Sequence, residues 1–102
     1  PTLTAAADVA IGERHTSEDR TGGQMRCWGR NNHGQLGDGT TAATLWPTAD
    51  PGLTDAASVS VGTSHTCATL TSGELRCWGY NSYYQLGDWT RTTRLTPTAV
   101  IW

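Results

Sequence analysis

The stretch RCWGRNNHGQLGD at residues 26–38 returns fifty residues later as RCWGYNSYYQLGD at residues 76–88. The similarity extends over both flanks of these stretches: residues 1–50 align with residues 51–100 without a gap, and 25 of the 50 aligned pairs are identical. Self-similarity at a fixed period of this length is typical of repeat architectures. The sequence therefore predicts two units, residues 1–50 and 51–100, followed by a tail at 101–102.

The pattern inside each unit favours short strands rather than helices. In the second unit, the runs typical of strands are 57–61, 65–70, 74–78 and 94–101. The second and third runs flank the turn signal Thr71-Ser72-Gly73, and Pro97 is tolerated only at the edge of a sheet. We predict an all-β fold of two four-stranded antiparallel sheets, each the size of a β-propeller blade.

Composition narrows the possible partners. The 102 residues carry a net charge of −2, include 18 Thr and 12 Gly, and contain no Lys. The absence of a cluster of basic residues argues against a nucleic-acid partner, because such partners are held through their phosphates. No apolar run approaches the roughly 18 residues of a membrane helix, which argues against a membrane partner.

The repeated motif resembles the regulator of chromosome condensation repeat. The matching features are Cys-Trp-Gly-x-Asn-x-x-x-Gln-Leu-Gly-Asp at 27–38 and 77–88, His-Thr at 15–16 and 65–66, and Pro-Thr-Ala at 47–49 and 97–99. The resemblance implies propeller blades whose loops bind other proteins. Relatives include a nucleotide exchange factor on chromatin and secreted bacterial inhibitors of β-lactamases, and the chain resembles the secreted bacterial members. These activities do not transfer, because the repeat residues build the blade and the loops choose the partner.

The motif residues have structural interpretations. We expect Trp28 and Trp78 to be largely buried between adjacent blades. His15 and His65 each lie beside a Thr with no second ligand at metal-binding spacing, which favours a structural role. The sequence predicts no metal site, no cofactor and no catalytic residue, because known catalytic motifs do not occur in it.

Two of the three cysteines predict a disulfide. Cys67 and Cys77 lie five residues on either side of Ser72, which places them opposite each other on antiparallel strands. The first unit has Ser17 in the equivalent place, so Cys27 has no cysteine opposite it unless it pairs between chains. A bridgeable pair in a chain rich in Thr and without Lys favours an extracellular location.

The two units differ in two segments. The first unit has Ser17-Glu18-Asp19-Arg20 where the second has Cys67-Ala68-Thr69-Leu70, so we expect this first hairpin to be exposed or frayed. The long connection of the second unit is aromatic, and Gly34 and Gly39 of the first unit are replaced there by larger residues. Its predicted binding residues are Tyr80, Tyr83, Tyr84, Trp89 and Arg91.

Two blades leave both outer faces bare, because blades bury their faces against other blades. Further blades of a longer protein, self-association into a homo-oligomer, or a face-to-face sandwich would each solve this problem. The unit boundaries favour a fragment or an engineered piece. Two functions stay open: a non-catalytic module that binds a protein partner or other copies of itself through the aromatic connection, and a purely structural blade pair that forms homo-oligomers without an external ligand.

Overall fold

The computed structural model of the protein describes residues 6–12, 14–20, 24–49 and 51–100. The strands of the first unit are β1 (Ala6–Ile11), β2 (His15–Arg20), β3 (Met25–Gly29) and β4 (Thr44–Ala49). The strands of the second unit are β5 (Ala56–Val61), β6 (His65–Leu70), β7 (Leu75–Gly79) and β8 (Arg94–Ala99). The predicted tail at 101–102 lies outside the described residues. Within those residues, no helical segment has the length and hydropathy required to cross a bilayer.

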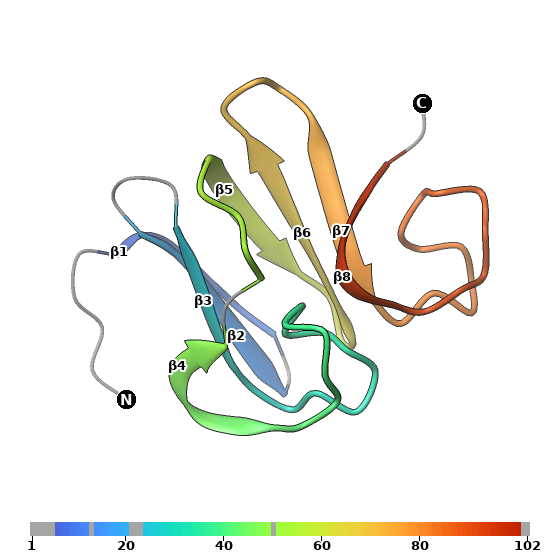
Figure 1. Cartoon of the computed structure of the whole chain (residues 1–102), viewed down its shortest axis with the longest axis horizontal. Helices are drawn as coiled ribbons and strands as arrows, with labels where there is room; N and C mark the ends of the chain where they lie inside the picture. Colours follow the sequence, from blue (N-terminus) through green and yellow to red (C-terminus); the bar gives the residue numbers. More distant parts are fainter. Residues whose placement is uncertain (1–5, 13, 21–23, 50, 101–102) are drawn as a thin grey trace.

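The strands form two four-stranded antiparallel sheets with the simplest possible topology (Figure 1). The first sheet has the order β1-β2-β3-β4, and the second has the order β5-β6-β7-β8. The prediction of an all-β chain with two such sheets is confirmed. Pro97 lies in β8, the edge strand of its sheet, where its missing N–H interrupts no ladder.

Side-chain alternation determines which residues of each strand face inward. In β6, Thr66, Ala68 and Leu70 are buried, whereas the residues between them are partly exposed. This period of two is the geometric consequence of an extended backbone, on which successive Cβ atoms point to opposite faces. The β6 pattern therefore gives the second sheet one face that packs against the first repeat.

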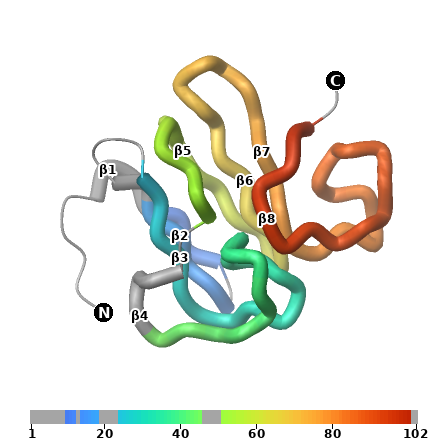
Figure 2. Tube along the Cα trace, in the orientation of Figure 1, coloured from blue at the N-terminus to red at the C-terminus, as the bar shows by residue number. Residues whose placement is uncertain are grey.

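The hydrophobic core lies between the two sheets. Strand β5 packs against β1 and β2, so the first strand of the second sheet joins the two repeats. The buried residues of this core are Met25, Cys27, Leu36, Ala56, Val59, Ala68 and Trp78. Figure 2 shows where the two long connections lie. Residues 30–43 lie close to β8, whereas residues 80–93 extend on the side away from the first sheet.

The expectation of an exposed or frayed segment at 17–20 is wrong for Ser17 and Glu18, whose side chains are completely buried. Strand β2 pairs with β1 along one edge and with β3 along the other, so it is an inner strand of its sheet. Glu18 occupies the position of the buried Ala68, but Ser17 is buried as well, whereas its counterpart Cys67 is partly exposed, so β2 does not repeat the alternation of β6. Both side chains therefore lie inside the protein despite their polar character, and the side chains of Asp19 and Arg20, which complete the predicted segment, lie outside the described part of the chain.

Candidate functional site

The long connection of each repeat is organised around one asparagine. Asn81 Nδ2 donates to the carbonyl oxygens of Thr90 and Thr92, both at 2.9 Å, and its Oδ1 accepts the backbone N–H of Leu86 at 3.0 Å. Asn31 makes the equivalent bonds in the first repeat, to the carbonyl oxygens of Thr40 and Ala42 and from the backbone N–H of Leu36. Both asparagines are buried, so these bonds replace water for the backbone of the loop.

Asp88 holds the second connection together through contacts with Asn81, Thr90 and Arg94. Its Oδ1 accepts bonds from Asn81 Nδ2 and from the N–H and hydroxyl of Thr90, and its Oδ2 pairs with Arg94 Nε at 2.9 Å. Burial raises the pKa of Asp88, but the bonds from Thr90, Arg94 and Asn81 outweigh burial and lower this pKa from 3.8 to about 2. The carboxylate is therefore ionised at neutral pH and holds the loop conformation.

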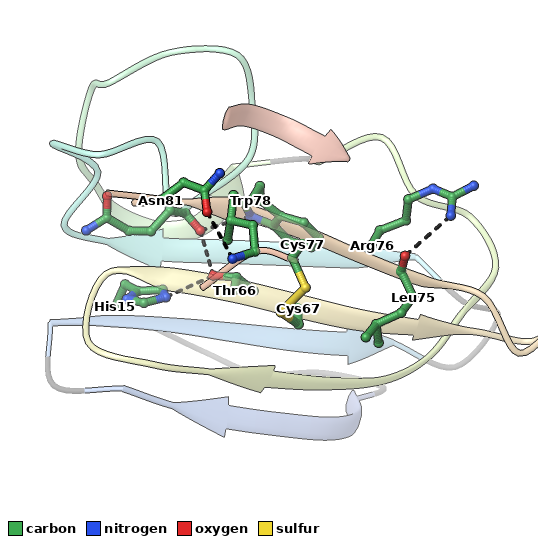
Figure 3. The surroundings of a disulfide bond; sticks show 10 residues. His15, Thr66, Cys67, Leu75, Arg76, Cys77, Trp78 and Asn81 are labelled. Atoms are coloured by element: carbon green, nitrogen blue, oxygen red, sulfur yellow. Dashed lines mark hydrogen bonds between the residues drawn. A yellow bond between two sulfur atoms is a disulfide. The ribbon is translucent and has the colours of Figure 1, made fainter. Parts of the chain in front are cut away.

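A chain of hydrogen bonds joins the two repeats at the backbone carbonyl of Gln35, and Figure 3 shows three of its other members, His15, Thr66 and Trp78. The carbonyl oxygen accepts the Thr66 hydroxyl at 2.7 Å and the Trp78 indole N–H at 3.0 Å. His15 Nε2 lies 2.9 Å from the same Thr66 hydroxyl. The Thr66 hydroxyl has one hydrogen, which it uses in the bond to the Gln35 carbonyl oxygen. It therefore accepts a hydrogen bond from His15, and this requires the hydrogen of the His15 ring to lie on Nε2.

This network favours a neutral His15. Burial is the largest cause and lowers the pKa of His15 below 6.5, a backbone hydrogen bond at His65 partly offsets it, and the charge of His65, the smallest of the three effects, lowers the pKa again. Burial also lowers the pKa of His65. Both histidines therefore resist protonation in the folded chain.

We expect the unfolding free energy of the chain to fall as the pH drops below 6.5. In this range the unfolded chain binds a proton at His15 and the folded chain does not, so stability is present above 6.5 and is lost as the pH falls toward the depressed native pKa. The slope for one proton is at most about 1.4 kcal/mol per pH unit. Urea unfolding at a series of pH values should show a reduced slope in His15→Gln, and an unchanged slope in that variant would contradict this assignment.

The two motif tryptophans differ in their surroundings. Trp78 is completely buried between the repeats, whereas Trp28 is only of intermediate burial. The reason is that the first repeat covers one face of the second sheet, whereas no described part of the chain covers the corresponding face of the first sheet. At the other outer face, a cavity of about 320 Å³ is lined by Thr63, Ser64, His65, Tyr80, Tyr83 and Gln85.

The predicted disulfide is confirmed. Cys67 and Cys77 are paired in the β6–β7 register, with Cα atoms 4.1 Å apart, and their sulfurs are bonded (Figure 3). In the first repeat, Ser17 and Cys27 are paired in the same way, and Ser17 Oγ lies 2.5 Å from Cys27 Sγ. Cys27 is buried, and its sulfur is a thiol rather than half of a disulfide.

The aromatic connection brings most of its predicted binding residues together. The rings of Tyr80 and Tyr83 pack edge to face with centroids 6.2 Å apart, and Tyr80 also packs on His33 of the first repeat at 4.5 Å. Arg91 lies over the Tyr84 ring at 5.8 Å and donates through Nε to the carbonyl oxygen of Ser82. The side chains are exposed by 79% at Tyr83, 60% at Tyr84 and 77% at Trp89.

Two of these aromatic residues occupy a backbone conformation that favours glycine. Tyr84 has φ 62° and Trp89 has φ 66°, close to the 73° and 83° of the equivalent Gly34 and Gly39. They are the two non-glycine residues with positive φ in the described part of the chain. A side chain in this region costs on the order of 1 kcal/mol relative to glycine.

Reasoning from the sequence overlooked two functional groups in the motif. The first is the asparagine at 31 and 81, whose presence in both repeats was a usable signal. The second is the Gln35 carbonyl, which belongs to the backbone and leaves no trace in a pattern of side chains. Across the residues that the structure describes, no group of three His, Cys, Asp or Glu side chains is arranged to hold a metal ion.

Solved structures show the same fold. Human WBSCR16 superposes with a TM-score of 0.80 at 24% identity, over 95% of this chain and 26% of that one. Yeast RCC1 (Prp20) bound to Kap60 gives a TM-score of 0.78 at 23% identity, over 100% of this chain and 24% of that one. A second structure, of Prp20p from Saccharomyces cerevisiae, gives 0.78 at 22% identity over 99% and 26%, and it is described together with binding to Gsp1p and histones. The chain therefore spans about a quarter of the length of these proteins.

These structures are human and yeast proteins, so the resemblance to secreted bacterial members stays a prediction. No curated protein sequence matches the chain. Models of the regulator of chromosome condensation (RCC1) repeat match residues 23–69 and residues 56–85. With two matching repeats and two matching blades, the chain belongs to the RCC1 repeat family.

Proposed function

We propose that the chain is a non-catalytic module that binds a protein partner through the aromatic connection of its second repeat. The observation that carries this proposal is the pair Tyr84 and Trp89, exposed side chains in a glycine-type conformation. Local backbone energetics disfavour both residues, so a contact made by their rings is the natural compensation. Exposed Tyr and Trp next to Arg91 have the composition of a binding hot spot.

Protein binding is also described for a protein with this fold. Yeast Prp20 is a protein with this blade architecture, and it has been solved with bound Kap60 and described as binding Gsp1p and histones. We carry over only the class, protein binding, because the loop residues and not the blade choose the partner. The Cys67–Cys77 disulfide further supports a location in an oxidising, extracellular environment.

The proposal can be tested with peptides that are selected by phage display for binding to the chain. The matched variant is Tyr83→His combined with Trp89→Gly, which restores the residues of the first repeat and leaves Tyr84 in place. We expect the selected peptides to bind this variant at least about tenfold more weakly, because hot-spot residues carry most of a binding energy. Ser72→Ala, in the distant β6–β7 turn, should bind the same peptides as the parent chain. Equal binding by all three proteins would place the contact surface elsewhere.

Self-association is the competing hypothesis, and the two outer faces of the chain are the surfaces that it would use. The outer faces carry the two unmatched halves of the interface between the repeats. One face has His65 and Gln85 around the cavity, and the other has the partly exposed Trp28 and the 81% exposed Leu45. Head-to-tail joining through these halves would generate a ring or an open chain of blades, and it requires room for Leu45 of the next copy on the outer face of the second repeat.

A further inference from the structure

The interface between the repeats depends on a close approach of two backbones. The first connection lies against β8, and Gly39 N–H donates to the Leu95 carbonyl oxygen at 2.9 Å. A Cβ at Gly34 would overlap Leu95 Cδ2 and would lie 3.0 Å from Leu95 Cα and 3.2 Å from the carbonyl oxygen of Arg94. Two of these three atoms belong to the backbone of β8 and cannot move aside independently. A side chain at position 34 would therefore displace the Leu95 side chain and press on the backbone of β8, so this contact site, called the β8 seat below, favours glycine.

The second repeat carries an equivalent of the β8 seat with a tyrosine in the place of that glycine. Tyr84 has nearly the same φ as Gly34, so its Cβ points to the place that is empty in the β8 seat. The residue that a head-to-tail neighbour would bring there is Leu45, the counterpart of Leu95. Leu45 is 81% exposed, so its side chain is available for such a contact.

From this mismatch we infer that Tyr84 is a specificity-determining residue, which excludes a second copy of the chain from the outer face of the second repeat. At the cavity, His65 and Gln85 match the His15 and Gln35 that receive Thr66 and Trp78. The face thus keeps these two polar residues of the interface, whereas Tyr84 occupies the place that Leu45 of a second copy would need. Replacing Tyr84 by glycine should open the face to head-to-tail assembly.

Trp89 provides a matched control for this inference. It is also an exposed aromatic residue with positive φ, so Trp89→Gly relieves a similar backbone strain. A Cβ at the equivalent Gly39, however, would meet only Thr96 Cγ2 at 3.8 Å, which is an ordinary van der Waals contact. A Cβ therefore fits beside the neighbouring strand at position 39, and by equivalence at position 89. At position 34, and by equivalence at position 84, a Cβ crowds that strand.

Sedimentation velocity over a roughly hundredfold range of protein concentration tests the inference. We expect the parent chain and Trp89→Gly to sediment as monomers at all concentrations. Tyr84→Gly should fold at least as stably as the parent, since glycine favours this φ, and its mass should rise with concentration. Adding Trp28→Ala to Tyr84→Gly should abolish the association, because Trp28 would take the role that Trp78 has inside the chain.

A monomeric Tyr84→Gly, an associating Trp89→Gly, or a parent chain that already associates through Trp28 would each overturn the inference. The inference does not rest on the proposed peptide-binding function. The peptide experiment keeps Tyr84 in all three proteins, and sedimentation uses no peptide. Failure of one proposal is therefore distinguishable from failure of the other.

Discussion

Trp78→Ala is expected to lower the unfolding free energy of the chain by about 3–5 kcal/mol, the usual range for removing a buried aromatic side chain. Trp78 is completely buried in the core that joins the two repeats. Its ring packs so closely on Gly37 that a Cβ there would lie 2.5–2.9 Å from three indole atoms. The substitution thus removes the packing of one repeat on the other together with a hydrogen bond to Gln35.

Trp28→Ala is the matched control for this prediction. It removes the same side chain from the same strand position of the first repeat, where the indole is only partly buried. We expect a loss of roughly 1–2 kcal/mol, because less apolar area returns to water. Urea unfolding followed by circular dichroism, with the disulfide intact, measures both variants. Equal losses would mean that Trp78 gains nothing from lying between the blades.

A hydrogen-bond variant separates packing from polar contact at Trp78. Trp78→Phe keeps an aromatic ring in the core and removes the indole N–H that bonds to Gln35. Thr66 still donates to that carbonyl oxygen, so the acceptor keeps one partner. The expected loss beyond the change in ring size is therefore about 1 kcal/mol, the net value of one neutral hydrogen bond.

The fold could be predicted from the sequence because its signals are local and occur twice. The alternation in 57–61, the turn at 71–73 and the edge proline at 97 each predict an element of a single blade, and the repeat doubles the prediction. The disulfide followed from the same local symmetry, since equal spacing about a turn places two residues opposite each other.

The differences between prediction and structure arise where a residue's surroundings come from another blade. Trp28 and Trp78 share the sequence Arg-Cys-Trp-Gly, and only the presence of a blade before the second repeat makes one more buried than the other. Glu18 was expected to be exposed from its charge, but it is completely buried in β2, an inner strand of its sheet. The acceptor that joins the blades is a backbone carbonyl, which every residue possesses.

Transferring the disulfide to the first repeat gives the other large effect. Ser17→Cys is expected to form a bridge with Cys27, because Ser17 and Cys27 have the same register in β2 and β3 as Cys67 and Cys77 in β6 and β7. The two side chains are already in contact, with Ser17 Oγ 2.5 Å from Cys27 Sγ. The bridge would close a short loop, for which constraint of the unfolded chain predicts a gain of roughly 2–3 kcal/mol.

For a chain of this size, that gain corresponds to a rise in melting temperature of the order of 10 °C. Peptide mapping of Ser17→Cys without reductant should find the new bridge to Cys27 alongside the Cys67–Cys77 pair, and thermal unfolding should be measured with and without reductant. Ser17→Ala is the control, since it changes the same buried position and cannot form a bridge. Because the gain comes from constraint of the unfolded chain, the added stability should disappear when the new bridge is reduced. Free thiols at positions 17 and 27, or a bridge without added stability, would show that the first hairpin does not share the geometry of the second.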